Sequence, residues 1–127
     1  MTIRVTVWGE NVHEQKNKVV AEVYPKTMHG TIAEFLNKED GIKASTVTLQ
    51  DPEHGMTAKK LAETDVLVWW GHAAHGEVKD EIVERVAEAV WSGMGVIFLH
   101  SAHFTKRFAS AQKVSTTGAP VIIGWLK

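Results

Sequence analysis

The sequence predicts an α/β domain with a parallel sheet, from the composition of four segments and of the stretches between them. The four segments are rich in β-branched and apolar residues, as buried strands are, and they span Ile3–Trp8, Thr46–Gln50, Val66–Trp70 and Gly95–Leu99. Residues at helical spacing lie between consecutive segments, so strand and helix alternate along the chain. Such alternation is typical of βαβ units, which are joined by right-handed crossovers and build a parallel sheet.

Helix signals separate these strands. Thr27 is a good N-cap for a helix that should end before Gly41, and Thr57 is the corresponding cap for a short helix at Ala58–Glu63. The clearest helix is Lys79–Trp91, because its apolar residues recur on one face. Near the end of the chain we expect a helix marked by Phe104 and Phe108 and an edge strand within Pro120–Leu126.

Composition favours an ordinary globular domain and excludes several classes of protein. The chain has 127 residues, 44% of them hydrophobic and 23% charged, with a formal net charge of -1. It has no cysteine, which rules out disulfides, thiolate metal sites and a cysteine nucleophile. Neither a signal peptide nor a membrane-spanning run is recognisable, so we expect a cytoplasmic protein without a membrane partner. The tryptophans are not embedded in basic runs, so no nucleic-acid partner is expected.

The histidines follow the predicted strands. Ligands of open parallel sheets bind outside the carboxyl ends of the strands, which makes the residues after each strand the natural candidates. All seven histidines fall in these strand-to-helix connections or at their edges: His13, His29, His54, His72, His75, His100 and His103. The sequence therefore predicts a histidine-rich ligand site at one edge of the sheet.

Two His-x-x-His pairs suggest a metal as the ligand. Imidazole is the commonest metal-binding side chain, and residues three apart share a face of a helical turn. The predicted ligands of a divalent metal such as zinc are His72, His75, His100 and His103. A polar pocket without metal is an equal alternative, and histidines that only bond backbone or solvent are a third. The predicted ligand-binding residues outside the pairs are Glu10, His13, His29, His54 and Trp70.

Catalytic candidates follow the fourth strand. Ser101 is placed as nucleophilic serines are in a G-x-S-x-G turn, but both glycines are missing. His100 is the other candidate, because an exposed imidazole can act as a general base near neutral pH. Trp70 could stack on a sugar, although a pair such as Trp69-Trp70 at the end of a strand more often places one ring in the core and one against a helix.

Five local motifs, in order, resemble one family: VTVWGENVHE, YPKTMHG, DPEHGMT, VLVWWGHAAH and GMGVIFLHSAHF. They resemble the ThuA family of trehalose-utilisation proteins, over about residues 3 to 108. The resemblance implies a class I glutamine amidotransferase-like, flavodoxin-like fold, which is a three-layer αβα sandwich. It also implies a role in trehalose or related sugar metabolism. His100 stands where the amidotransferases carry their nucleophilic cysteine, so the resemblance implies that glutamine is not the substrate.

The resemblance ends in a divergent tail, residues 109–127, within a single domain that spans residues 1–127. We therefore expect a family member truncated at its C-terminus and a homo-oligomer. The expected function is the binding of a sugar derivative at the histidine-rich, metal-containing or metal-free pocket. The alternatives are a non-enzymatic sugar-sensing or partner-binding module and an inactive truncated family member, and the sequence does not decide whether the protein is an enzyme.

Overall fold

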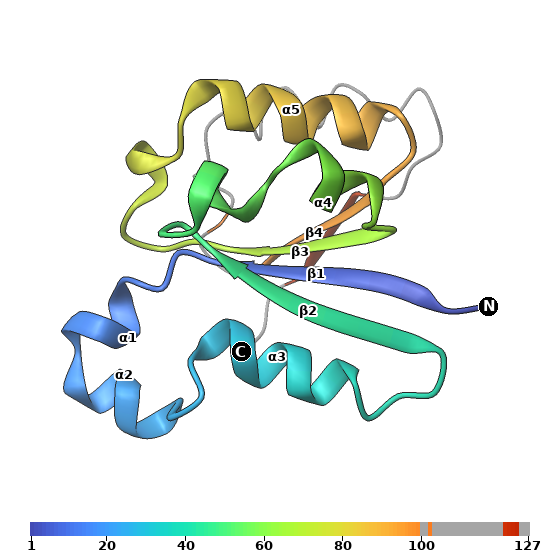
Figure 1. Cartoon of the computed structure of the whole chain (residues 1–127). Coiled ribbons are helices and arrows are strands. Elements are labelled where there is room, and N and C mark those ends of the chain that lie inside the picture. The colour runs from blue at the N-terminus through green and yellow to red at the C-terminus, as the bar shows by residue number, and fades with distance from the viewer. Residues whose placement is uncertain (100–101, 103–120, 125–127) are drawn as a thin grey trace.

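The computed structural model describes residues 1–99, 102 and 121–124, and its centre is a five-stranded parallel sheet (Figure 1). The strands lie in the order β2-β1-β3-β4-β5. Their bounds are Ile3–Gly9 for β1, Ile42–Thr48 for β2, Val66–Trp70 for β3, Gly95–Leu99 for β4 and Val121–Gly124 for β5. The prediction of an α/β domain with a parallel sheet is confirmed.

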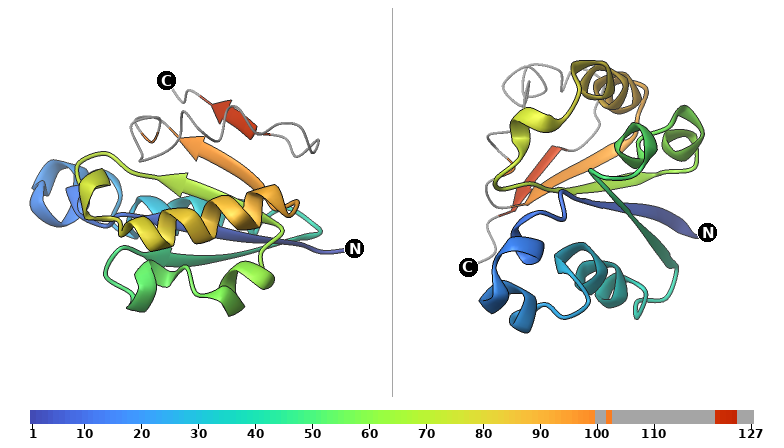
Figure 2. Two further views of the ribbon diagram at one scale, coloured as in Figure 1. Left: turned by 90° about the horizontal axis from the view of Figure 1, so that it is seen from above. Right: turned by 60° about the vertical axis from the view of Figure 1, so that its left-hand side comes forward.

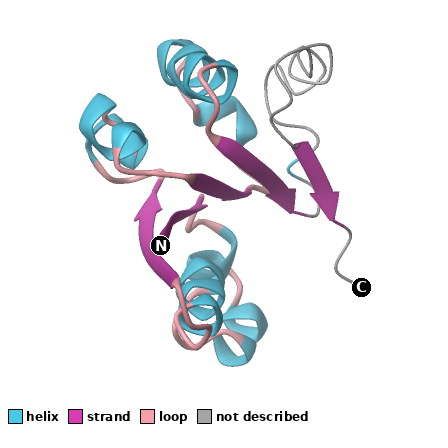
Figure 3. Ribbon diagram, turned by 90° about the vertical axis from the view of Figure 1, so that its right-hand side faces the viewer, coloured by secondary structure: helices cyan, strands magenta, loops and turns pink. Residues whose placement is uncertain are grey.

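Helices cover both faces of this sheet, as Figures 2 and 3 show. One face carries α1 (His13–Lys16), α2 (Lys18–Val23) and α3 (Met28–Leu36). The opposite face carries α4 (Ala58–Ala62) and α5 (Asp80–Trp91). Two 3-10 turns, η1 (Pro52–Gly55) and η2 (His75–Glu77), lead into α4 and α5. No helix in the described part of the chain has the length and apolar character needed to cross a bilayer.

The strand order creates a switch point between β1 and β3. From β1 the chain moves to β2 on one side and then returns to place β3 on the other side. The two connections therefore leave the sheet in opposite directions, and a crevice forms at the carboxyl ends of β1 and β3. Their registered ends, Gly9 and Trp70, are paired at this crevice.

The second strand begins and ends earlier than the sequence suggested. The prediction of Thr46–Gln50 was wrong, because β2 spans Ile42–Thr48 and pairs with the full length of β1. This strand is an edge strand with several exposed polar side chains, so apolar content did not mark its start. At the other edge, β5 lies within the predicted range Pro120–Leu126. The predicted helix at Phe104 and Phe108 lies outside the described residues.

The two adjacent tryptophans of β3 point to opposite faces. Trp69 stacks on Trp8 in the core between the sheet and α5, with ring centroids 3.8 Å apart and an interplanar angle of 10°. The indole N–H of Trp8 donates to the carbonyl of His54 at 2.9 Å. Because side chains alternate along a strand, Trp70 is left facing the layer of α1, α2 and α3. This alternation brings an aromatic ring to the carboxyl edge of the sheet.

Candidate ligand site at the carboxyl ends of the strands

A cavity of about 360 Å³ lies at the carboxyl edge of the sheet, beside the switch point. It is enclosed by side chains from α1, α2 and α3, from the ends of β3 and β4, and from the loop after β3. The lining residues are His13, Val20, Tyr24, Met28, Ile32, Trp70, His72 and Leu99. Its walls are mostly apolar with few polar groups, which is the usual make-up of a small-molecule site.

Three of the residues predicted from the sequence converge in this cavity. His13 and His72 come from the connections after β1 and β3, and their ring centroids lie 5.0 Å apart at 60°. His72 also lies over Trp70, with centroids 6.2 Å apart and planes at 27°. The two imidazoles and the indole thus form one cluster, although they lie up to about sixty positions apart in the sequence.

Glu10 holds the loop that carries His72. Its side chain is fully buried, and its two oxygens accept the backbone N–H groups of Ala73 at 2.6 Å and Ala74 at 3.0 Å. These hydrogen bonds compensate a carboxylate that would otherwise be costly to bury. Gly71 completes the arrangement, because a Cβ there would lie 3.2 Å from the ring of His75 and 3.6 Å from Glu10. Glu10 therefore fixes the position of the loop after β3 through these two hydrogen bonds.

A second buried carboxylate lies behind His13. Glu14 accepts the backbone N–H of Met28 at 3.4 Å through Oε1, and the same oxygen is 3.7 Å from Nδ1 of His29. The other ring nitrogen of His29 lies 3.1 Å from the hydroxyl of Thr27, the N-cap of α3. Burial lowers the pKa of His29, and the nearby carboxylates of Glu14 and Asp51 oppose this effect. His29 thus lies beneath the cavity wall, and it is not one of the lining residues.

The lowered pKa of His29 gives a pH prediction. The unfolded chain takes up a proton on this side chain near its ordinary pKa of 6.5, while the folded chain does so only at lower pH. The free energy of unfolding should therefore decrease as pH falls below about 6.5. Urea unfolding of wild type and His29→Gln between pH 7.5 and 5 should show a shallower decrease for the variant. Equal slopes would contradict this account.

The ring of His29 also requires glycine at the end of β1. A Cβ at Gly9 would lie 2.5 Å from Nδ1 of His29 and 2.9 Å from its Cβ. Gly9→Ala should therefore destabilise the fold by about 1–3 kcal/mol, as overpacking does. Gly76→Ala is the matched control, because a Cβ there meets nothing within 4 Å. Thermal unfolding should separate the two variants, and equal melting temperatures would contradict the close packing of His29 on β1.

His54 has a structural role in this arrangement. Its Nε2 accepts the backbone N–H of Lys79 at 3.2 Å, so the neutral ring donates from Nδ1 to the carbonyl of Leu49 at 2.8 Å. Both nitrogens are therefore engaged, and the ring joins the end of β2 to the start of α5. The sequence analysis placed His54 among the ligand-binding residues because it follows a predicted strand. The position of a histidine in the sequence does not show which hydrogen bonds its ring will make.

The metal and catalytic predictions fall largely outside the described residues. His72 and His75 are described, at the loop after β3 and at the start of η2, whereas His100, Ser101 and His103 are not. Within the described residues, no group of three or more histidine, aspartate or glutamate side chains is placed to hold a metal ion. The metal ligands therefore stay a prediction.

Sequence reasoning missed the apolar wall of the site. Val20 belongs to α2 and Tyr24 is the C-cap of that helix, while Met28 and Ile32 belong to α3. The connection before Thr27 shows no strong helical pattern in the sequence. The only available signal was its length, since long connections in compact domains are often functional.

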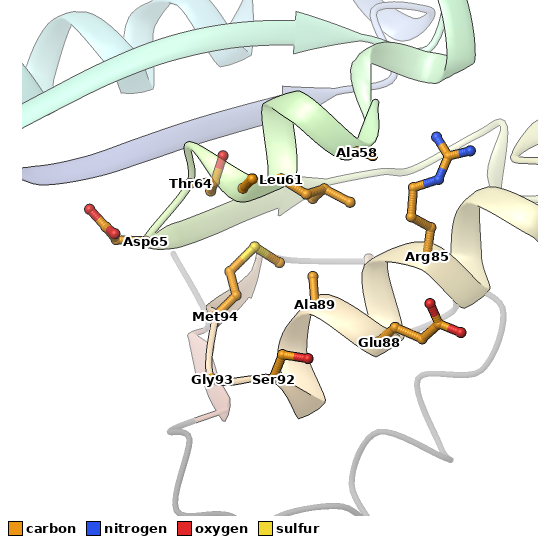
Figure 4. Close-up of a pocket in the computed structure, with 11 residues that line it drawn as sticks. Ala58, Leu61, Thr64, Asp65, Arg85, Glu88, Ala89, Ser92, Gly93 and Met94 are labelled. Carbon is orange, nitrogen blue, oxygen red and sulfur yellow. The ribbon is translucent and has the colours of Figure 1, made fainter.

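A larger cavity of about 530 Å³ lies between α4 and α5 (Figure 4). It begins at the amino ends of β3 and β4, beside Asp65 and Met94, and extends toward Arg85. Among the residues that the structure describes, neither a histidine nor an aromatic side chain lines it. We favour the smaller cavity as the ligand site, because parallel sheets bind ligands at their carboxyl ends and because the imidazole cluster lies there.

A parallel sheet of this strand order, with a cavity beside its switch point, defines a flavodoxin-like α/β protein. The profile of the ThuA family, described as trehalose utilisation, matches residues 4–121. The chain therefore belongs to the ThuA family. This membership is consistent with the expected class I glutamine amidotransferase-like superfamily. The match continues past Phe108, where recognisable motifs end, and reaches the first residue of β5. No curated protein matches the chain.

Proposed function

We propose that the protein binds a sugar or sugar derivative related to trehalose in the cavity between α2, α3 and the end of β3. The observation that carries this proposal is the cluster of Trp70, His72 and His13 in a cavity otherwise lined by apolar side chains. Membership of the trehalose utilisation family supports a sugar as the ligand.

The chemistry of the lining suits a sugar ring. A sugar presents an apolar face of C–H groups and a rim of hydroxyls. The face can pack on the indole of Trp70, while the imidazoles of His13 and His72 can each donate or accept a hydrogen bond from a hydroxyl. A cavity of about 360 Å³ suits one small ligand better than a polymer.

Titration calorimetry with trehalose and a keto derivative of trehalose tests the proposal. We expect saturable binding by the wild type and at least a tenfold weaker affinity for His72→Ala, because this variant removes one polar partner. The side chain of His72 is exposed, so the variant should remain folded. Glu77→Gln, an exposed change in the same connection, should bind as the wild type does. Absence of binding to both sugars would contradict the proposal.

Glutamine hydrolysis is not part of the proposed function. Amide hydrolysis needs hydrogen-bond donors that stabilise the oxyanion at the attacked carbonyl. The resemblance to class I amidotransferases implies that the loop after β3 would supply these donors. The N–H groups of Ala73 and Ala74 in the loop after β3 are already used by the carboxylate of Glu10. The absence of cysteine from the sequence supports the same conclusion.

A divalent metal is the second candidate ligand, and the spacing of two imidazoles favours it. Two imidazoles that ligate one tetrahedral zinc have ring centroids about 5 Å apart, from the usual Zn–N distance and angle. His13 and His72 lie at 5.0 Å. Further ligands would come from His100 and His103.

Zinc titration separates this candidate from a metal-free sugar site. One zinc per chain, lost in both His13→Ala and His72→Ala, would support a metal site. The same zinc content in the wild type and both variants would place any bound zinc elsewhere and contradict it. Glu77→Gln serves again as the control.

A further inference from the structure

One wall of the cavity belongs to a separate segment, residues 11–26, which we name the α1–α2 flap. It contributes three lining side chains, from His13, Val20 and Tyr24. The remaining lining residues belong to α3, to the strand ends and to the loop after β3. The flap therefore forms one side of the cavity, and the rest of the domain forms the other sides. Figure 1 shows α1 and α2 at the margin of the domain, beyond the carboxyl end of β1.

The hydrophobic anchor of the flap is small: Val12, which is only partly buried, packs against the main core cluster. Glu14 is the only buried side chain of the flap, and α2 contains no buried residue at all. The outward face of α2 exposes Val19 and Val23, which are 67% and 63% accessible. Segments with few buried apolar contacts open at a lower free energy than the core does, and moving elements at ligand sites are usually of this kind. Burial therefore does not hold the flap firmly to the domain.

The backbone has a positive φ at both ends of the flap. Asn11 has a φ of 51°, and Thr27, just past the other end, has a φ of 66° with a ψ of 163°. Asparagine tolerates the left-handed region, but a β-branched residue at positive φ is a genuine outlier. Such residues cluster at hinges and switches, where the surrounding contacts hold them in place. The flap is thus bounded at each end by a residue with positive φ, at the positions where a hinge would lie.

Glu14 is the only fully buried side chain that joins the flap to the domain. The other polar links are exposed: the Lys26–Glu34 ion pair at 2.8 Å and the hydrogen bonds between Asn11 and Gln50. Oε1 of Glu14 accepts the N–H of Met28 at a long 3.4 Å, and it is 3.7 Å from Nδ1 of His29. Oε2 of Glu14 and Nδ1 of His29 are both buried without a hydrogen-bond partner among the described residues. A buried carboxylate with so few partners loses hydration that it does not fully recover. The contact is specific, and we expect breaking it to cost less free energy than opening the core does.

We propose that the α1–α2 flap opens and closes over the ligand cavity and that Glu14 is the latch, a positioning residue that holds His13 in the closed arrangement. Opening would break the contact of Glu14 with α3 and expose the cavity wall formed by Val20 and Tyr24. Closure would enclose a ligand against Trp70. The identity of that ligand rests on the proposed function, but the motion itself does not.

Native-state hydrogen exchange of the full chain tests the latch without any ligand. The reporters are flap amides with backbone hydrogen bonds, those of Lys16, Asn17, Ala21 and Tyr24. In the wild type they should exchange at least tenfold faster than amides of β1 and β3, through a local opening. Equal protection of flap and strands would show that the flap does not open separately and would overturn the proposal.

Variants of Glu14 then identify the latch. Glu14→Ala should raise flap exchange a further tenfold or more and leave β1, β3 and α5 within twofold of wild type. Glu14→Gln keeps an acceptor for Met28 and should stay within threefold, as should the control Glu22→Gln, an exposed change in α2. No change in Glu14→Ala, or a uniform rise over the whole domain, would overturn the role of Glu14.

Trehalose separates this proposal from the proposed function. If both are right, saturating trehalose should slow exchange of the flap in the wild type. If trehalose changes nothing while Glu14→Ala still raises flap exchange alone, the latch is supported and trehalose is rejected as the ligand.

Discussion

Replacing Glu10 by alanine should destabilise the protein by about 2–4 kcal/mol, because it removes a fully buried carboxylate and leaves two backbone N–H groups without their acceptor. The N–H of Ala74 is buried with its residue, so water cannot readily replace the lost bond. The loop after β3 should lose its fixed shape, and His72 should lose its place beside Trp70. Urea unfolding measures the first effect, and hydrogen exchange at residues 71–75 measures the second.

Two further variants separate hydrogen bonding from charge at this position. Glu10→Gln keeps one acceptor oxygen but turns an amide NH2 toward an N–H donor, so we expect a loss of roughly 1–3 kcal/mol. Glu77→Gln, an exposed change of the same type in the same connection, should stay within about 0.5 kcal/mol of wild type. If Glu10→Ala were as stable as Glu77→Gln, the anchoring role of Glu10 would be wrong.

Replacing Trp70 by leucine should weaken sugar binding by tenfold or more while the protein stays folded. Leucine keeps an apolar side chain at this buried position, so the loss of stability should be about 1–3 kcal/mol, below that of a truncation to alanine. It removes the flat ring on which a sugar face would pack and the partner of His72. Calorimetric titration with trehalose measures the affinity, and circular dichroism checks the fold.

Trp91 provides the matched control for Trp70. It lies at the end of α5, on the opposite face of the sheet, and its side chain is 43% accessible. Trp91→Leu should therefore bind trehalose as the wild type does. Equal affinities of the two leucine variants would show that the cavity of Trp70 is not the sugar site.

The central strands and the longest helix could be predicted from the sequence because their patterns are strong. Val66–Trp70 is continuously apolar, since both of its faces are covered, and α5 has a regular apolar face. The edge strand β2 and the short helices α1 and α2 could not be placed in this way. Their side chains are largely exposed, so no burial pattern marks where they begin.

The candidate site was predictable in its location but not in its internal bonding. The rule that ligands bind at the carboxyl ends of parallel strands was enough to bring His13, Trp70 and His72 together. It did not reveal that Glu10 bonds backbone N–H groups or that both nitrogens of His54 are engaged. Such roles depend on hydrogen bonds to main-chain atoms of residues that are distant in the sequence. Every residue has the same main-chain atoms, so the residue types do not show which of them will be partners.

The most direct test of the ligand site is an NMR titration of the 15N-labelled full chain with trehalose. The account predicts that amide shifts concentrate in residues 13–32 and 70–75, with the indole resonance of Trp70 among them. It also predicts that the larger cavity between α4 and α5 stays unperturbed. Shifts concentrated around Leu61, Arg85 and Ala89, or no shifts at saturating sugar, would contradict the assignment of the site.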